Sequence, residues 1–242
     1  MAAKAPRTKA ARVALEVHER MSVALAVPRV ELDFEDAWQL VIATILSAQS
    51  TDKTVNRVTP ALFARYPTPA ELAAAPLEEL EVLVKTTGFF RNKARAIRDA
   101  SLMIAERFGG TVPRTIEEMI ELPGVARKTA NVVLGSAYRV VSGIVVDTHV
   151  GRVARRLRLT RGEDPVDVER SLMKLFARQD WIDTGHRLVL HGRYVCTARS
   201  PRCESCPLNE ICPSAEAEPV GSWQERAAAE QARVEARGED VE

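Results

Sequence analysis

The stretch LPGVARKTANVV, residues 122–133, joins a tight turn to the start of a helix. Pro123 and Gly124 are turn residues, and a helical pattern begins directly after them. Lys128 therefore falls in the first turn of that helix, where the helix dipole presents partial positive charge. A cation is unfavourable there, so the sequence raises the question of what Lys128 does.

Two physical effects favour the neutral amine of Lys128, namely the helix dipole and partial desolvation. A neutral lysine is a nucleophile that can form a Schiff base with a carbonyl-type carbon. The alternative interpretation is a surface lysine that contacts a phosphate group.

The periodicity predicts an all-α fold. Residues 36–48 are apolar nearly all round, which is typical of a helix buried in a bundle. Residues 140–146 are the only strand-like run, and they are too isolated to build a sheet. Helix starts are indicated by the pairs Thr68 with Glu71, Thr115 with Glu118, and Asp164 with Pro165. A further helical stripe comprises Ala94, Ile97, Ser101, Ile104 and Phe108.

Composition bounds the class of protein. The chain has 242 residues and a net charge of only +1. From residue 213 onward there are eight acidic and three basic residues, so residues 1–212 carry a net charge of +6. No apolar run is long enough to span a membrane, and the basic N-terminus lacks the apolar core of a signal peptide. We therefore expect an intracellular protein, located in the cytoplasm or nucleoid if the source is a bacterium, and no membrane association.

All four cysteines lie within 17 residues, with the spacing Cys196-x6-Cys203-x2-Cys206-x5-Cys212. In a reducing compartment they are metal ligands and not disulfides. Four thiolates on one loop can hold either zinc or an iron–sulfur cluster. The loop also carries Arg199 and Arg202, which suit contact with phosphate.

These motifs together resemble the endonuclease III family of DNA glycosylases. The cysteine spacing after LHGRYVC is similar to the family's iron–sulfur loop, which holds a [4Fe–4S] cluster. LSAQSTD (46–52), LVKTTGFFRNKA (83–94), LPGVARKTANVVL (122–134) and VDTHVGRV (146–153) occur in the family's order. The resemblance extends from about residue 31 to residue 212. It implies two helical domains with a DNA cleft between them, a helix–hairpin–helix motif and a C-terminal [4Fe–4S] loop.

The resemblance assigns roles to individual residues. It implies that Lys128 is the nucleophile and that Asp147, also a candidate helix N-cap, stabilises charge and assists proton transfer. It implies DNA contacts from the hairpin, which comprises Gly124, Val125, Ala126, Arg127 and Thr129. Ala126 departs from the family's second hairpin glycine. An alanine there costs about 1 kcal/mol if the position needs positive φ, and is harmless if the backbone is already helical.

Extraction of a base from the duplex needs side chains that fill the vacated space. The resemblance places Gln49 in that role, with Phe89 as a second wedge where many relatives have leucine. The alternatives are a capping glutamine and a core phenylalanine.

The sequence thus predicts a bifunctional DNA glycosylase and abasic-site lyase that removes oxidised pyrimidines from duplex DNA. We expect a monomer with four segments. These are a basic N-terminal tail and helix that packs with the iron–sulfur domain (1–30), a helical barrel domain with the hairpin (31–141), the iron–sulfur cluster domain (142–212) and an acidic, flexible tail (213–242).

Two alternatives remain. The related adenine-mismatch glycosylases lack the hairpin lysine and place a catalytic glutamate before the glutamine motif, where this chain has VIATILSAQ. A non-catalytic iron–sulfur or zinc module would bind nucleic acid without needing Lys128 and Asp147.

Overall fold

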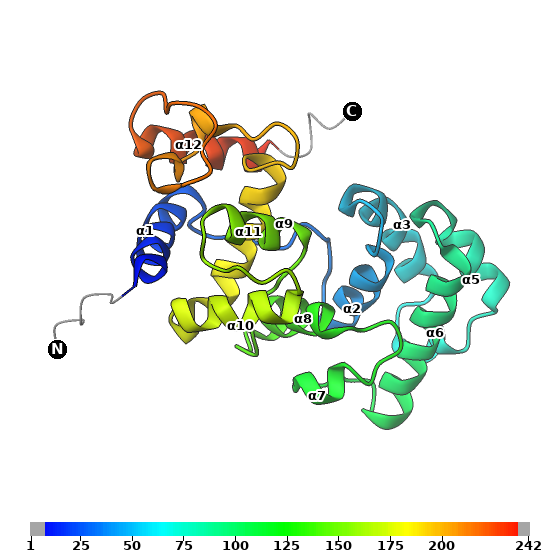
Figure 1. Ribbon diagram of the computed structural model, residues 1–242. Coiled ribbons are helices and arrows are strands. Elements are labelled where there is room, and N and C mark those ends of the chain that lie inside the picture. Colours follow the sequence, from blue (N-terminus) through cyan, green and yellow to red (C-terminus); the bar gives the residue numbers. More distant parts are fainter. Residues whose placement is uncertain (1–7, 237–242) are drawn as a thin grey trace. The chain divides into compact units, whose positions relative to one another are not determined.

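In the computed structural model, residues 8–236 are described, and they form helices without any strand (Figure 1). None of these helices has the length and apolar character that a membrane crossing requires. The α-helices are α1 (Lys9–Ala24), α2 (Ala37–Leu46), α3 (Asp52–Arg65), α4 (Pro69–Ala73), α5 (Leu77–Leu83), α6 (Phe90–Arg107), α7 (Ile116–Met119), α8 (Arg127–Tyr138), α9 (Thr148–Arg156), α10 (Pro165–Leu175), α11 (Trp181–Tyr194) and α12 (Trp223–Glu235). Short 3-10 helices are η1 (Lys85–Thr87), η2 (Arg178–Asp180), η3 (Cys203–Ser205) and η4 (Asn209–Ile211).

The chain divides into two compact units. Unit 1 comprises Met1–Arg29 and Gly143–Glu242, and unit 2 comprises Val30–Ser142. The N-terminal helix α1 thus belongs with the later part of the chain. Residues 1–7 of the expected basic tail and residues 237–242 of the expected acidic tail lie outside the described residues.

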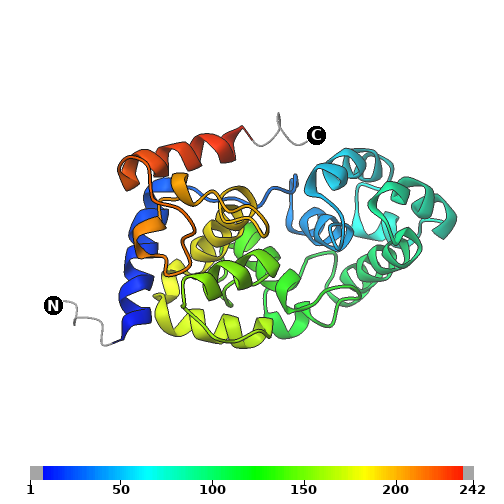
Figure 2. The same cartoon turned by 45° about the horizontal axis from the view of Figure 1, so that its top comes forward.

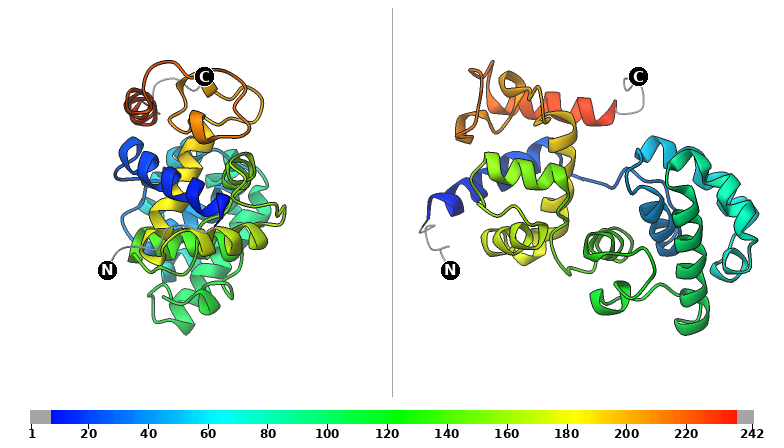
Figure 3. Two further views of the ribbon diagram at one scale, coloured as in Figure 1. Left: turned by 60° about the vertical axis from the view of Figure 1, so that its left-hand side comes forward. Right: turned by 45° about the vertical axis from the view of Figure 1, so that its right-hand side comes forward.

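Unit 2 is built around α2, whose residues are almost all buried, as the apolar run 36–48 predicts. Asp36 begins this helix by accepting a hydrogen bond from the backbone N–H of Gln39 at 2.8 Å. The long helix α6 packs against α2, α4 and α5 (Figure 3). Its buried face contains Ala94, Ile97 and Ser101, and Ser101 accepts a hydrogen bond from the indole of Trp38 at 3.0 Å. The helical periodicity therefore located the core of this unit correctly.

The hairpin lies in unit 2 between α7 and α8. Thr115 starts α7 by accepting a hydrogen bond from Glu118 N–H at 3.3 Å. A tight turn at Pro123 and Gly124 follows, and α8 begins at Arg127. The predicted turn at Pro123 and Gly124 and the helix that starts directly after it are confirmed, as in a helix–hairpin–helix element.

Unit 1 has its own core, to which α1, α9, α10, α11 and α12 all contribute. Helix α11 packs along α9, and α1 lies beside α12 (Figure 2). The contact of α11 with α9 is close because Gly192 has no side chain: a Cβ there would lie 2.7 Å from the Cβ of His149. The glycine of the LHGRYVC motif is therefore needed for helix packing.

The expectation of a flexible acidic tail over residues 213–242 is wrong for the stretch Trp223–Glu235, which is helical. Helix α12 occupies Trp223–Glu235, and a capping box formed by Ser222 and Glu225 starts it. The helix buries Ala227 and Val234 together with the charged residues Arg226 and Glu230. Few large apolar residues predict a flexible tail, but this helix is held by small apolar residues and by ion pairs of Glu230 and Arg226.

Candidate functional site

The turn before α8 depends on Gly124. Its φ of +78° lies in the left-handed region that favours glycine. A Cβ at this position would also lie 3.1 Å from the Cβ of Ala96 and 3.4 Å from Ile45. Both the backbone angle and the close packing therefore require glycine, while Gly124 itself remains exposed.

Ala126 has an extended backbone, with φ −92° and ψ 170°, and is the N-cap residue of α8. Alanine is unstrained in this conformation, so the departure from the family's second glycine leaves the turn intact. Its side chain cannot accept a hydrogen bond, and the first intrahelical bond runs from Ala130 N–H to Ala126 O. The N–H groups of the first turn thus have no acceptor within the helix, which suits an anion.

Lys128 is the second residue of α8, in the first turn as predicted. Its side chain is exposed, so the fold does not supply the partial desolvation that we expected. What remains is the positive end of the helix dipole, with the cationic Arg127 as its neighbour in sequence. The amine is accessible to a ligand.

Asp147 is the N-cap of α9. Its Oδ1 accepts hydrogen bonds from the backbone N–H groups of His149 at 2.8 Å and Val150 at 2.9 Å. The carboxylate is half-buried, and within residues 8–236 its Oδ2 has no hydrogen bond. Capping therefore occupies one oxygen and leaves the other for a ligand.

Gln49 and Phe89 share an unusual backbone. Both have positive φ, 53° for Gln49 and 45° for Phe89, which is unfavourable for residues other than glycine. Phe89 is 64% exposed, which rules out the alternative of a core phenylalanine. Gln49 is exposed too, and it follows the end of α2 without serving as a cap. Strained backbone and exposure together are typical of residues held for a ligand.

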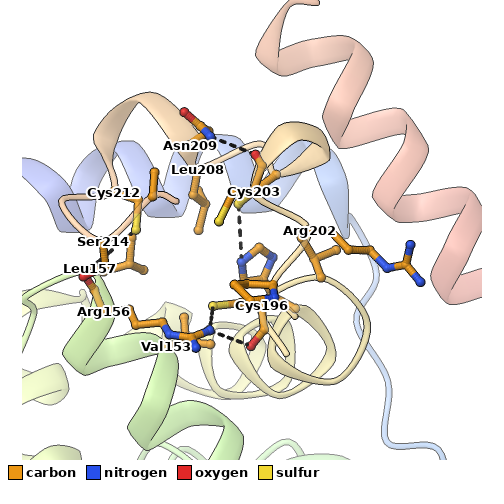
Figure 4. Close-up of a pocket in the computed structure, with 15 residues that line it drawn as sticks. Val153, Arg156, Leu157, Cys196, Arg202, Cys203, Leu208, Asn209, Cys212 and Ser214 are labelled. Atoms are coloured by element: carbon orange, nitrogen blue, oxygen red, sulfur yellow. Dashed lines mark hydrogen bonds between the residues drawn. The ribbon is translucent and has the colours of Figure 1, made fainter. Parts of the chain in front are cut away.

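The four cysteines line one pocket at the end of α11, as the spacing predicts. Figure 4 shows Cys196, Cys203 and Cys212 around the same hollow, and Cys206 also belongs to its lining. Four thiols around one pocket are a ligand set that fits an iron–sulfur cluster.

The surroundings of the thiols also fit an anionic cluster. Burial alone would raise the pKa of Cys196, but hydrogen bonds from His191 and Arg156 outweigh it and lower that pKa. Burial raises the pKa of Cys212, so metal binding would have to displace its proton. Burial likewise opposes the charged form of His191, but the Glu230 carboxylate holds the pKa of His191 well above its ordinary value.

Sequence reasoning missed two arginines of α9 that contact the backbone and sulfur of the cysteine loop. Arg156 donates hydrogen bonds to Cys196 Sγ at 3.2 Å and to Thr197 O at 2.7 Å. Arg152 donates to Cys196 O at 3.0 Å and to Gly192 O at 2.7 Å. The four-residue spacing of Arg152 and Arg156 could have indicated a shared partner, because it puts both side chains on one face of α9.

Arg199 and Arg202 are exposed, and the Arg202 side chain points away from the cysteines (Figure 4). The predicted site residues divide between the units. The hairpin, Gln49 and Phe89 belong to unit 2, whereas Asp147 and the cysteine loop belong to unit 1.

Comparison with known proteins matches two family models. The model of the HhH-GPD superfamily base excision DNA repair proteins matches residues 42–178, and that of the iron–sulfur binding domain of endonuclease III matches residues 196–212. The chain is 53% identical to an endonuclease III of Synechocystis over 77% of this chain and 85% of the relative. It is 50% identical to that of Bacillus subtilis over 75% and 83%. Among solved structures, a trapped endonuclease III–DNA covalent intermediate is 43% identical, with a TM-score of 0.80 over 87% of this chain and 98% of that one.

Proposed function

The chain belongs to the endonuclease III family of the HhH-GPD superfamily, and from this premise we propose that Lys128 and Asp147 carry out its chemistry. The chain is a base excision repair DNA glycosylase and abasic-site lyase with a [4Fe–4S] cluster. One observation carries the catalytic assignment: Lys128 is an exposed amine on the uncapped first turn after a glycine hairpin. Borohydride reduction of the lysine–DNA imine tests it.

In the proposed mechanism, Lys128 Nζ attacks C1′ of the damaged nucleotide. The bond from C1′ to the base breaks, and the base leaves with the electron pair and takes up a proton. The sugar ring opens to an imine that links Nζ to C1′. Loss of a proton from C2′ then expels the 3′ phosphate, and water releases the lysine. The free Oδ2 of Asp147 stabilises the positive charge that develops on the sugar and assists the proton transfers.

The hairpin is proposed to bind phosphate through its backbone. Gly124 allows close approach, and the first-turn N–H groups of α8 are available for an anion. This is contact with the backbone of DNA, which positions the enzyme without reading sequence. The proposed contacts come from Gly124, Val125, Ala126, Arg127 and Thr129.

Ala126→Ser tests this use of the uncapped turn. A serine at the N-cap accepts a hydrogen bond from the first-turn N–H groups and should raise the free energy of unfolding by about 1 kcal/mol. The same oxygen competes with phosphate, so affinity for a duplex with an uncleavable abasic analogue should fall. Denaturation and binding titrations measure the two effects, with Ala74→Ser at another exposed helix end as control. Unchanged affinity in a stabilised Ala126→Ser protein would exclude the phosphate role.

We propose oxidised pyrimidines in duplex DNA as the substrate, extruded from the stack with Gln49 and Phe89 filling the space. Their exposure and positive φ support this assignment. The structure also explains how the Phe89 loop is held: the buried Lys93 ammonium donates a hydrogen bond to Thr87 O at 2.5 Å. The backbone of the loop is therefore held by Lys93, while the side chain of Phe89 remains exposed.

Phe89→Ala should weaken binding to a lesion duplex by about 1–3 kcal/mol, the range for loss of one aromatic–base stack. Excision under single-turnover conditions should slow, while the free energy of unfolding changes by less than about 0.5 kcal/mol because the side chain is exposed. Val82→Ala is the matched control, since Val82 is an exposed apolar residue of the same unit. Excision at the parental rate by Phe89→Ala would show that Phe89 is not a wedge.

The cluster is proposed to be held by Cys196, Cys203, Cys206 and Cys212, which line its pocket. Its loop presents the exposed Arg199 and Arg202, for which we propose contact with DNA phosphates. We further propose that the protein acts as an intracellular monomer, in the cytoplasm or nucleoid of a bacterial cell. The adenine-mismatch alternative is disfavoured by Lys128 at the hairpin and by the match to endonuclease III relatives.

A further inference from the structure

Helix α12 buries two charged side chains. Arg226 is 2% exposed and Glu230 is fully buried. Removing an ionised group from water is strongly unfavourable unless a partner compensates it. A helix that only covered α1 could be built from apolar residues such as Ala227 and Val234. The burial of two charges therefore indicates specific partners beneath α12.

The partner of Glu230 is His191 of α11. His191 Nδ1 lies 2.9 Å from Glu230 Oε1 and 3.1 Å from Oε2, and both side chains are buried. The other ring nitrogen, Nε2, lies 3.8 Å from Cys206 Sγ. Because a ring bonded at one edge cannot rotate freely, Glu230 fixes the edge that His191 presents to this sulfur.

The partners of Arg226 lie in the cysteine loop itself. Its Nε donates to Cys206 O at 2.8 Å, and its other nitrogens pair with Glu210 and with Gly221 O. Both buried charges of α12 therefore act on Cys206, one through its backbone and one through its sulfur. Cys206 is the most buried of the four cysteines.

Helix α1 holds the same segment from another side. Arg20 donates to Pro207 O at 2.9 Å and pairs with Glu210 at 2.6 Å. Glu210 thus joins Arg20 of α1 to Arg226 of α12. Residues 206–210 are therefore bonded to both α1 and α12 through hydrogen bonds and ion pairs of the buried Arg20 and Arg226.

We infer that α12 stabilises the iron–sulfur loop. Its residues Glu230 and Arg226 are positioning residues that hold Cys206 in place for the cluster. Helix α12 begins after residue 212, where the match to the endonuclease III iron–sulfur model ends. The inference requires the [4Fe–4S] cluster but neither Lys128 nor Asp147, so loss of the proposed catalytic roles would leave it standing.

The test compares three full-length holoproteins that carry Glu230→Gln, Arg226→Lys or Glu235→Gln. Glutamine keeps the volume of Glu230 but removes its charge, and lysine cannot reproduce the forked contacts of Arg226. Glu235→Gln makes the same carboxylate-to-amide change on the exposed face of α12 and serves as control. Iron per chain after anaerobic purification is measured first. The decay of the visible absorbance in air with an iron chelator follows, at a temperature well below unfolding.

Cluster decay should be at least about tenfold faster in Glu230→Gln and Arg226→Lys than in the control, the range seen when partners of metal ligands are removed. Helix content by circular dichroism and the melting temperature of each protein are recorded alongside. Decay equal to the control would overturn the proposal. So would a variant that unfolds or loses helix in parallel with its iron, because α12 would then stabilise the fold generally and not the cluster site.

Discussion

Lys128→Arg is expected to bind lesion DNA and yet to form no covalent bond with it under borohydride. A Schiff base is an imine, which borohydride reduces to a permanent bond between the protein and DNA. Arginine keeps a positive charge on the first turn of α8 but cannot be deprotonated at working pH, so it cannot attack C1′. Trapping and strand cleavage should therefore fall to background on both lesion-bearing and abasic duplexes.

This substitution separates the two interpretations of the lysine. A phosphate contact needs only the charge, whereas a nucleophile needs a neutral amine. Lys128→Ala should also fail to trap and should bind more weakly, because it removes the charge as well. Lys174→Arg, at an exposed position of α10, controls for the chemical change itself. Strand cleavage at the parental level by Lys128→Arg would make Lys128 a phosphate contact and would refute the mechanism.

Local signals in the sequence predicted the fold and much of the candidate site. The turn residues Pro123 and Gly124 fix where α8 begins, and this places Lys128 on its first turn without any tertiary information. Asp147 as the cap of α9 is equally local, since its acceptors are two and three residues away. The cysteine spacing predicts a metal loop because all four thiols lie on one short segment.

Features that depend on distant segments were not predictable in this way. The guanidinium of Arg156 donates a hydrogen bond to Cys196, 40 residues further along the chain. No residue near Arg156 in the sequence indicates this contact. Glu230 is stable in the interior only because His191 lies opposite. Composition classifies such residues as solvated, since charged side chains are almost never fully buried unless they are paired.

The exposure of Lys128 was also beyond local reasoning, because partial desolvation depends on what packs around the helix start. The described structure leaves this amine accessible. DNA bound over the first turn of α8 would exclude water from this amine. Trapping of wild type on abasic DNA therefore tests the nucleophile in the complex with the duplex.

Asp147→Asn should keep the fold and DNA binding but lose base excision by about 10²–10⁴-fold, the usual contribution of a positioned acid–base group. Asparagine is as good an N-cap as aspartate, so its amide oxygen can keep the bonds to His149 and Val150. The negative charge that would stabilise the sugar is lost. Single-turnover excision from a lesion duplex, with denaturation curves on the same protein, measures both properties.

Asp164→Asn is the matched control, because Asp164 caps α10 in the same way by accepting a hydrogen bond from Val166 N–H at 2.8 Å. If capping were the only role of Asp147, the two substitutions would have similar, small effects on stability and neither would slow excision by the folded protein. A pre-formed abasic site separates the roles further. It needs no base removal, so Lys128 in Asp147→Asn should still be trapped there by borohydride while excision from the lesion duplex is lost.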